Sequence, residues 1–273
     1  MKTLSINLKA IDNLIELIVI GDTHIGSTNF NDSLLDSTIQ YVLEQPNRYV
    51  ILNGDILDCN FKDSVGNIYE NALSPSVALG LAVKIFEPIK DRIICSIGGN
   101  HDHDRSMKQV DISYAQQLAT LLGIADKFSA DSIILFLSVE GGIKGHTNKN
   151  VQYVVFCSHG NNGGGGTMGS KANALEKMSL CVPRADLFIH SHTHAPVIFK
   201  DTYFDIDEKK KTLAQKERLY VNTNAYLRWQ NSYGEKKLLK PQSMSIPIVK
   251  MKSYREHARK VDKIRKSITC ELW

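Results

Sequence analysis

Five short apolar runs along the chain each end abruptly in a cluster of polar residues. The runs cover residues 17–20, 49–52, 93–97, 154–157 and 187–189. Apolar runs of this length, rich in branched side chains, predict strands that are buried on both faces. We therefore expect each polar cluster to lie just beyond the carboxyl end of a buried strand.

Stretches with helical spacing separate these runs. Apolar residues recur with that spacing in two of them: Leu34, Leu35, Ile39 and Val42, then Val77, Leu81, Ile85 and Ile89. Ser74 and Pro75 suit the N-cap and first turn of the second helix. Shorter apolar sets at 115–122 and 174–178 predict two more helices. Strands that alternate with helices predict a largely parallel sheet covered by helices, and such sheets bind ligands at the carboxyl ends of their strands.

The polar clusters contain side chains suited to binding metal ions. There are seven of them: Asp22, His24, Asp55, Asn100, His159, His192 and His194. Oxygen and imidazole donors without thiolate favour Mn²⁺, Fe or Mg²⁺-like ions, and Zn²⁺ is also open. A single histidine is usually a packed core or surface residue, but seven of the nine histidines lie in or beside these clusters. Such a concentration at predicted strand ends indicates a metal site.

The order of these motifs resembles the motif series of the calcineurin-like metallophosphoesterases. The motifs are Asp22-x-His24, Gly54-Asp55, Gly99-Asn100-His101-Asp102, His159 and His192-x-His194, and the match extends over residues 17 to 195. The resemblance implies an α/β (α+β) fold in which a β-sandwich is flanked by helices, with a dinuclear metal site at the carboxyl ends of the strands. One departure is mild: Ser191 precedes His192 where glycine is commoner, which leaves both histidines intact.

The resemblance also implies how the metal-binding side chains divide between two divalent ions. The implied assignment is Asp22, His24 and His194 for the first ion, Asn100, His159 and His192 for the second, and Asp55 as the bridge between them. We expect the ions to be Mn²⁺, with Fe, Zn²⁺ or Mg²⁺ as alternatives. Two such ions lower the pKa of a shared water, which gives a hydroxide at neutral pH, and they neutralise the phosphate oxygens.

Two further residues would have catalytic roles by the same resemblance. His101 would lie over the substrate and either stabilise charge or protonate the leaving oxygen as a general acid. Asp58 follows the bridging carboxylate by three residues, where the family often places the partner that orients this histidine and fixes its tautomer. Alternatively, Asp58 caps a turn, as Asp commonly does. We expect Asp102 to brace its loop rather than to touch substrate.

The leading functional hypothesis is a phosphodiesterase that acts on nucleic acid or nucleotides. Protein serine/threonine phosphatases of this family have Asp-Arg-Gly after the second motif, whereas Cys59 and Asn60 follow Asp58 here. One alternative is a phosphomonoesterase of the same family. Another is a scaffold that has lost its metals, although the intact set of ligands argues against it.

A glycine pattern raises a third class, the nucleotide-binding oxidoreductases. Gly164-x-Gly166-x-x-Gly169 formally matches the dinucleotide-binding fingerprint. However, Asn161 and Asn162 separate the glycines from the preceding strand, so the tight first turn of that motif is lost. We favour a flexible loop beside the metal site, whose amides could cradle a phosphate.

Two weaker signals remain open between a functional and a structural role. Arg105 and His103 follow the third motif and could contact a substrate phosphate through charge-assisted hydrogen bonds, or could be exposed without a role. Trp229, with Arg228, Tyr226 and Tyr233 nearby, could form a surface for stacking nucleic-acid bases. Packing of these aromatic residues in and around the core is the favoured interpretation.

The end of the chain is basic, and we divide the chain at that point. Residues 1–249 form the predicted catalytic domain and 250–273 a basic C-terminal helical extension, because Val261, Ile264 and Ile268 have helical spacing. Such a segment could bind the backbone of DNA or RNA through counterion release. The favoured alternative is a solvated basic helix packed on the domain.

Composition limits where the protein acts. The formal net charge of +4 leans basic without requiring a nucleic-acid partner, and 42% hydrophobic residues are ordinary for a globular protein. No apolar run approaches the roughly 20 residues needed to span a membrane. The five cysteines are scattered without a CxxC pair, so the sequence suggests neither a disulfide framework nor a thiolate zinc site. With no signal-like start, these features predict a cytoplasmic protein without a membrane partner.

Overall fold

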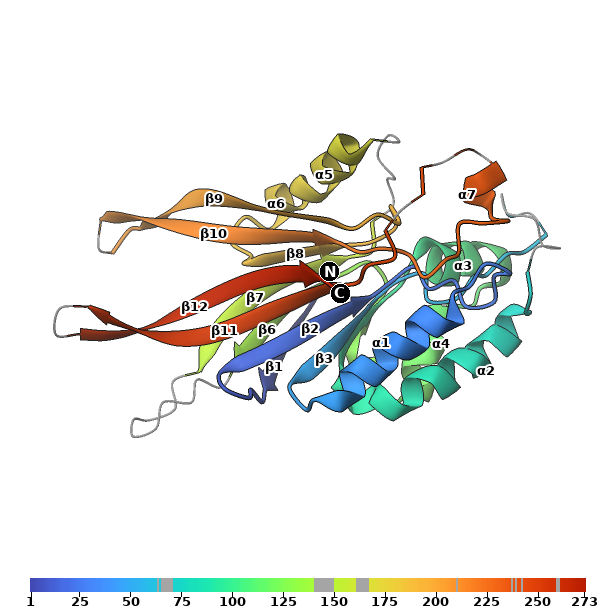
Figure 1. Ribbon diagram of the computed structural model, residues 1–273, viewed down its shortest axis with the longest axis horizontal. Helices are drawn as coiled ribbons and strands as arrows, with labels where there is room; N and C mark the ends of the chain where they lie inside the picture. Colours follow the sequence, from blue (N-terminus) through green and yellow to red (C-terminus); the bar gives the residue numbers. More distant parts are fainter. Residues whose placement is uncertain are drawn as a thin grey trace.

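Two six-stranded mixed sheets pack face to face, and helices cover both outer faces (Figure 1). The computed structural model describes residues 1–62, 64, 71–139, 150–160, 167–209, 211–236, 238, 240–241, 243–258 and 261–273. This arrangement confirms the predicted α/β sandwich flanked by helices. The five strands predicted from apolar runs are all present, but they are divided between two sheets instead of lying in one parallel sheet.

The first sheet has the strand order β1-β6-β7-β8-β10-β9. Its strands are β1 (Lys2–Leu8), β6 (Ser132–Val139), β7 (Val151–Ser158), β8 (Leu187–His190), β10 (Thr212–Asn222) and β9 (Val197–Asp207). The pairs β1·β6, β7·β8 and β8·β10 are parallel, whereas β6·β7 and β9·β10 are antiparallel.

The second sheet has the order β12-β11-β2-β3-β4-β5. Its strands are β12 (Val261–Leu272), β11 (Pro247–Ala258), β2 (Leu14–Ile20), β3 (Arg48–Asn53), β4 (Ile93–Ile97) and β5 (Phe128–Ser129). The strands from β2 to β5 are parallel, and β11 adds an antiparallel strand beside β2.

Helices cover the sheets and connect them to the loops at one rim. They are α1 (Asp32–Glu44), α2 (Pro75–Phe86), η2 (Glu87–Arg92), η3 (Asn100–Arg105), α3 (Ser106–Val110), α4 (Tyr114–Leu121), η4 (Ala125–Lys127), α5 (Met168–Glu176), α6 (Met178–Cys181) and α7 (Tyr233–Lys236). Among the helices in the described part of the chain, none has the length and apolarity that crossing a membrane requires.

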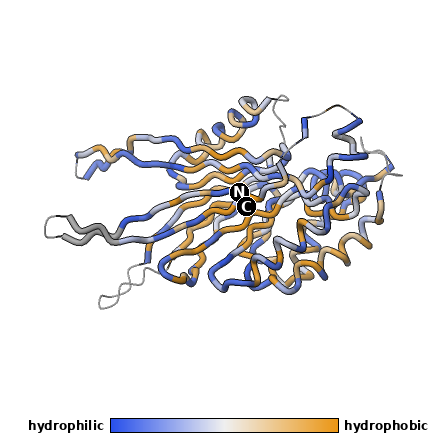
Figure 2. Tube along the Cα trace, in the orientation of Figure 1, coloured by the Kyte–Doolittle hydropathy of each residue, from blue (hydrophilic) through white to orange (hydrophobic). Residues whose placement is uncertain are grey.

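Three buried clusters hold these layers together. One cluster lies between the two sheets and includes Leu17 and Val19 of β2 and Leu187 of β8. A second cluster lies between the second sheet and helices α1, α2 and α4, and a smaller one lies between the first sheet and helices α5 and α6. Figure 2 shows hydrophobic residues along the central strands of the sandwich and in the helices that flank it. Each fully buried aliphatic side chain contributes about 1.5–3 kcal/mol to folding.

The predicted helix after Ser74 and Pro75 is present as α2, and of its predicted apolar face Ile89 is buried and Leu81 and Ile85 pack against the core, but Val77 does not. Val77 is 56% exposed, while Ala78 and Ala82 are buried. The helix is apolar on most of its surface, so the spacing of its large side chains does not reveal which face is buried. Its buried residues are Ala78, Leu79, Ala82 and Phe86, and α2 packs against helices α1 and α4.

The predicted C-terminal helix is also wrong, because residues 247–272 form the hairpin β11–β12. Val249 and Met251 alternate with polar residues and are fully buried, as expected of a strand with one face in the core. Ile268 lies opposite Met251 on the partner strand. The proposed boundary between residues 249 and 250 falls inside β11. The helical spacing was coincidental, and pairing with β2 fixes the segment as a strand.

The basic hairpin extends away from the rim that carries the polar clusters. Ile248 pairs with Ile18 near the carboxyl end of β2, and Lys252 pairs with Leu14 at its start, so β11 continues beyond β2 in the opposite direction (Figure 1). Lys250 forms an ion pair with Glu271. Nucleic-acid binding by the basic segment therefore stays a prediction, and it would occur far from the polar rim.

Candidate metal centre

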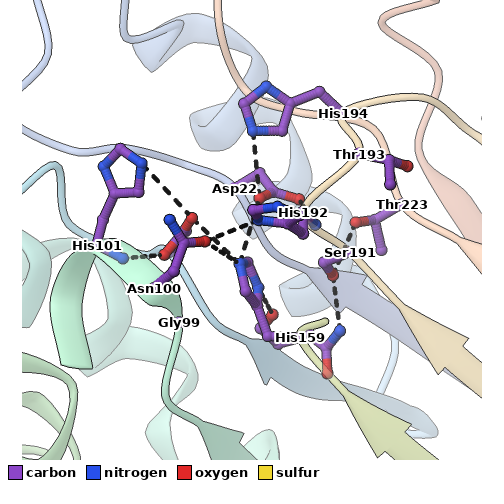
Figure 3. A network of polar contacts seen from close by, with 12 residues as sticks. Asp22, Gly99, Asn100, His101, His159, Ser191, His192, Thr193, His194 and Thr223 are labelled. Atoms are coloured by element: carbon purple, nitrogen blue, oxygen red, sulfur yellow. Dashed lines mark hydrogen bonds and ion pairs between the residues drawn. The ribbon is translucent and has the colours of Figure 1, made fainter. Parts of the chain in front are cut away.

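The metal-binding side chains predicted from sequence converge at one rim of the sandwich (Figure 3). Asp22 and His24 follow β2, Asp55 follows β3, Asn100 follows β4, His159 follows β7, and His192 and His194 follow β8. Both sheets thus contribute donors. All seven are at least partly buried, and the side chain of His194 is 37% exposed. The structure brings all seven together.

One group of donors consists of Asp22, His24 and His194. The Asp22 Oδ1 atom lies 3.4 Å from His194 Nε2, and the two Nε2 atoms of His24 and His194 are 3.3 Å apart. This is the set that the family resemblance implies for the first ion.

A second group consists of Asp55, His159 and His192, with Asn100 between the two histidines. The Asp55 Oδ2 atom lies 3.1 Å from His159 Nε2. The Asn100 Oδ1 atom lies 3.1 Å from the same nitrogen and 2.7 Å from His192 Nδ1. The two groups adjoin, since His159 Nε2 is 3.9 Å from Asp22 Oδ1. The bridging role of Asp55 stays a prediction.

These side chains present lone pairs to one another, as a cation site requires. Asp22 Oδ1 is buried without a hydrogen-bond partner in the described part of the chain. His159 Nδ1 lies 2.8 Å from the backbone carbonyl of Asn53, so Nδ1 carries a proton and Nε2 is the nitrogen that a cation would bind. Nitrogen and oxygen donors in this arrangement fit divalent ions of the Mn²⁺, Fe, Mg²⁺ or Zn²⁺ type.

The electrostatics of the second group show how strongly its members interact. Burial alone would lower the pKa of His159, but the carboxylates of Asp55 and Asp22 raise it to about 10. Burial would raise the pKa of Asp55, but His159 and His101 hold it well below its usual range. Without a cation, a proton on His159 therefore offsets the carboxylate charge.

Asp58 connects the metal-binding residues to His101. Its Oδ1 atom lies 2.8 Å from His101 Nδ1 and 3.6 Å from His24 Nδ1. Burial would raise the pKa of Asp58, but hydrogen bonds from His101 and His24 together hold this pKa below its ordinary value, so the carboxylate is ionised. Its Oδ2 atom accepts a hydrogen bond from Asn60. The contact between Asp58 and His101 is the one expected from sequence, where a simple turn cap was the alternative.

The predicted brace, Asp102, holds two of the polar loops together. It is fully buried, and its Oδ2 atom accepts backbone N–H groups of Ile56 at 2.7 Å and Leu57 at 3.3 Å. Its Oδ1 atom accepts the N–H of Gly99 at 2.8 Å. Asp102 thus ties the loop after β3 to the loop after β4, which carry Asp55 and Asn100.

The backbone at the centre is held in an uncommon conformation that sequence analysis did not reveal. Five of the donor residues have positive φ: Asp22, His24, Asp55, His192 and His194, with φ between 47° and 64°. Left-handed conformations of non-glycine residues cost about 1–3 kcal/mol and persist where the surroundings fix them, commonly at functional sites. Gly54, at φ 83°, also leaves room for His159, since a Cβ atom there would lie 2.5 Å from His159 Nδ1.

A buried polar network behind the donors was also missed. Asn53 Nδ2 donates to Ser191 Oγ at 2.6 Å, and Thr223 Oγ1 donates to the same oxygen at 2.9 Å. Ser191, the departure from the family motif, is therefore a link between the two sheets. Lys171, on α5, is buried and donates from Nζ to the Thr193 carbonyl at 3.0 Å. Polar residues at the ends of β3 and β10 were the signal available in the sequence.

Arg105 and His103, which follow the third motif, make different contacts. Arg105 reaches the site and contacts the ring of His101. His103 turns away, and its Nδ1 atom lies 2.7 Å from Ser113 Oγ. The structure therefore assigns a packing role to His103 and keeps Arg105 as a candidate for substrate contact.

The remaining sequence candidates lie outside the centre or outside the described residues. Residues 161–166, with most of the glycine pattern, are outside the described residues, and Gly169 lies in α5. Tyr226 is fully buried, which confirms the packing interpretation for that residue. The side chain of Tyr233 lies outside the described residues.

A sandwich with helices on both faces and a rim of converging Asp, Asn and His side chains defines a metallophosphoesterase-type protein. A sequence model of the family described as calcineurin-like phosphoesterase matches residues 15–196, and the chain belongs to that family. No curated protein matches the sequence significantly. Among solved structures, the chain is similar to a predicted phosphoesterase of Streptococcus pneumoniae at 11% identity and a TM-score of 0.37, over 93% of this chain and 98% of that one. It is also similar to the Zn²⁺ complex of wild-type Vps29 of Entamoeba histolytica at 11% identity and a TM-score of 0.30, over 93% and 99% of the two chains.

Proposed function

We propose that this protein is a cytoplasmic, metal-dependent hydrolase that cleaves phosphate diesters in nucleic acids or nucleotides. The observation that carries the proposal is the convergence of the two donor groups beside a further histidine, His101. A scaffold that had lost its metals would have no need for this complete set of donors.

Each donor group would hold one divalent ion, with Asp55 shared between the two ions. When bound, such a pair of ions lowers the pKa of a water molecule and neutralises charge on the phosphate oxygens. The contribution of the chain is to hold the donors in place before any ion binds. The hydrogen bond from His159 to Asn53 and the contact of His24 with Asp58 direct the Nε2 atom of each histidine into the site.

His101 would deliver the proton that the leaving oxygen requires. Its Nδ1 atom is held by the ionised carboxylate of Asp58, so Nε2 is the nitrogen that faces the reacting group. The backbone N–H of His101 donates to Asp55 Oδ1 at 2.7 Å, which fixes the residue relative to the proposed bridge. General acid catalysis by such a side chain contributes about 10²–10⁴-fold in rate.

The choice of a diester in nucleic acid rests on the sequence. The motifs after β2 and β4 resemble those of nucleases and small phosphodiesterases of the family, and Cys59 and Asn60 replace the Arg-Gly of its protein phosphatases. We propose Mn²⁺ as the metal. Five unpaired cysteines, three of them buried, are in keeping with a reducing compartment such as the cytoplasm.

A panel of substrates with added Mn²⁺ tests the proposal. The substrates are an aryl phosphodiester, an aryl phosphomonoester, and labelled single- and double-stranded DNA. We expect turnover of the diester and of DNA. Turnover of the monoester alone would support the phosphomonoesterase alternative, and a protein that binds no metal and cleaves none of the substrates would support the scaffold.

Two variants separate the proposed roles of the site residues. Asp55→Asn removes a carboxylate shared by the two ions, so we expect loss of activity together with weaker metal binding by calorimetry. His101→Asn leaves the donors in place, so we expect loss of activity with unchanged metal content. Retained turnover in the Asp55 variant would contradict the mechanism.

A further inference from the structure

Arg105 places a guanidinium group directly on the proposed catalytic histidine. It ends the turn η3, four residues after His101. Arg105 Nη1 lies 3.0 Å from His101 Nδ1, and Arg105 Nη2 lies 3.1 Å from His101 Nε2. The two ring nitrogens of a histidine point in diverging directions within the ring plane, so one guanidinium cannot meet both in that plane. The guanidinium therefore stacks on the face of the ring.

The protein fixes this guanidinium but does not neutralise it. Arg105 Nη1 donates to Asn60 Oδ1 at 2.6 Å and lies 3.4 Å from the Cys59 carbonyl. None of the ion pairs within the described part of the chain includes Arg105, and the nearby carboxylate of Asp58 is instead engaged by histidines. A guanidinium has five N–H donors in a planar fork. Those that the described residues do not use can receive an anion.

The location of Arg105 indicates which part of a substrate would supply that anion. His101 marks the side of the scissile phosphate from which the leaving group departs, because it would protonate the leaving oxygen. Arg105 lies against the ring of His101 and is only partly buried. An anion on Arg105 would therefore belong to the leaving group and not to the phosphate under attack. Planar forks of this kind recognise phosphate oxygens in pairs.

We propose that Arg105 binds a second phosphate, carried by the leaving group, and that the enzyme thereby prefers diesters within a phosphorylated chain to isolated diesters. The proposal rests on the proposed function, since His101 defines the leaving-group side. It makes a terminal phosphate on a short nucleotide substrate a determinant of specificity.

Three dinucleotides of thymidine test this preference. One has no terminal phosphate, one has a 5′-phosphate and one has a 3′-phosphate, and kcat/KM is measured for each with Mn²⁺ at constant ionic strength. We expect one phosphorylated form to exceed the unphosphorylated dinucleotide by about 10- to 100-fold, the range of a charge-assisted bidentate contact. In Arg105→Gln this ratio should fall to near 1. Arg105→Lys keeps the charge without the fork and should give an intermediate ratio.

Lys108→Gln is the matched control, because it removes one positive charge from the adjacent, exposed part of α3. This variant should keep the ratio of the wild type. Equal rates for the three dinucleotides in the wild type would overturn the proposal. So would an Arg105→Gln variant in which all three rates fall by the same factor, since Arg105 would then only support His101. A protein inactive on every diester, including the aryl diester, would instead show that the proposed function itself is wrong.

Discussion

The buried carboxylate of Asp102 offers a direct test of how the metal-binding loops are held. Both carboxylate oxygens of Asp102 accept hydrogen bonds from backbone N–H groups, which belong to Gly99, Ile56 and Leu57. Asp102→Asn replaces one of these oxygens by an NH₂ group. Whichever way the amide turns, at least one buried N–H loses its acceptor and faces another donor. Each such group costs about 1–3 kcal/mol, so we expect the variant to lose about 2–4 kcal/mol of unfolding free energy.

Urea denaturation followed by circular dichroism measures this loss, and a thermal scan should show Tm lower by about 5–10 °C. Asp104→Asn is the control, because Asp104 lies two residues away on the same turn and is exposed, so its effect should stay within about 0.5 kcal/mol. We also expect weaker Mn²⁺ binding in the Asp102 variant, since the two loops carry Asp55 and Asn100. A destabilisation below about 1 kcal/mol, or one equal to that of the control, would refute the bracing role.

Three further predictions concern the metal centre and the fold around it. The pKa of His159 is raised to about 10 by Asp55 and Asp22, so an ion must displace a proton at neutral pH, and Mn²⁺ affinity should rise as pH rises from 6 to 9. Calorimetry in buffers of different ionisation enthalpy should show the release of this proton. A pH-independent affinity would contradict this prediction. Gly54→Ala should abolish metal binding, because its Cβ atom would lie 2.5 Å from His159 Nδ1. Gly80→Ala in α2 is the control, because the added Cβ atom has no neighbour within 4 Å and should stabilise the protein by about 0.5–1 kcal/mol. Removal of residues 247–273 should prevent folding, and not merely weaken DNA binding, because β11 covers the edge of β2. A truncated protein with a native circular dichroism spectrum and a cooperative melt would contradict this prediction.

The elements that the sequence predicted correctly have local signals. The runs ending at Ile20, Leu52 and Ile97 are buried on both faces, so nearly every residue in them is apolar. Helix α1 has a clear polar face and a buried face that includes Leu35 and Ile39, and its position was predicted correctly. In each case, the apolar residues that are buried in the element also form the sequence pattern that predicts it.

The elements that were missed depend on their partner strands. Strand β9 alternates between half-buried and exposed residues, and Phe204 on it is 69% exposed, so its composition resembles a polar surface segment. It becomes a strand by pairing with β10. Strand β11 likewise depends on β2, which lies more than 200 residues earlier in the sequence. Spacing within a short window contains no information about such pairings.

The chemistry of the site was predictable where it depends on residue type, and not where it depends on shape. Asp, Asn and His at successive strand ends indicated the donors, and all seven meet. No pattern indicated the left-handed backbone at Asp22 or His192, because those conformations are imposed by neighbouring loops. The backbone N–H of Asp22 donates to the carbonyl of Gly54, and the N–H of His192 donates to Asp22 Oδ2. The first contact joins neighbouring loops of the second sheet, and the second exists only after the two sheets have packed.

The division of donors between the sheets explains how the fold holds charged groups so close together in a buried site. Asp22 and Asp55 come from the second sheet and His159 from the first, so their approach is fixed by the packing of the sandwich and by the bridge from Asn53 to Ser191. The free energy that opposes this approach is offset by burial of the apolar core between the sheets. A cation that enters the site therefore meets donors already in place and does not have to gather them. A cation held by donors from both sheets would also add a link between them at this rim.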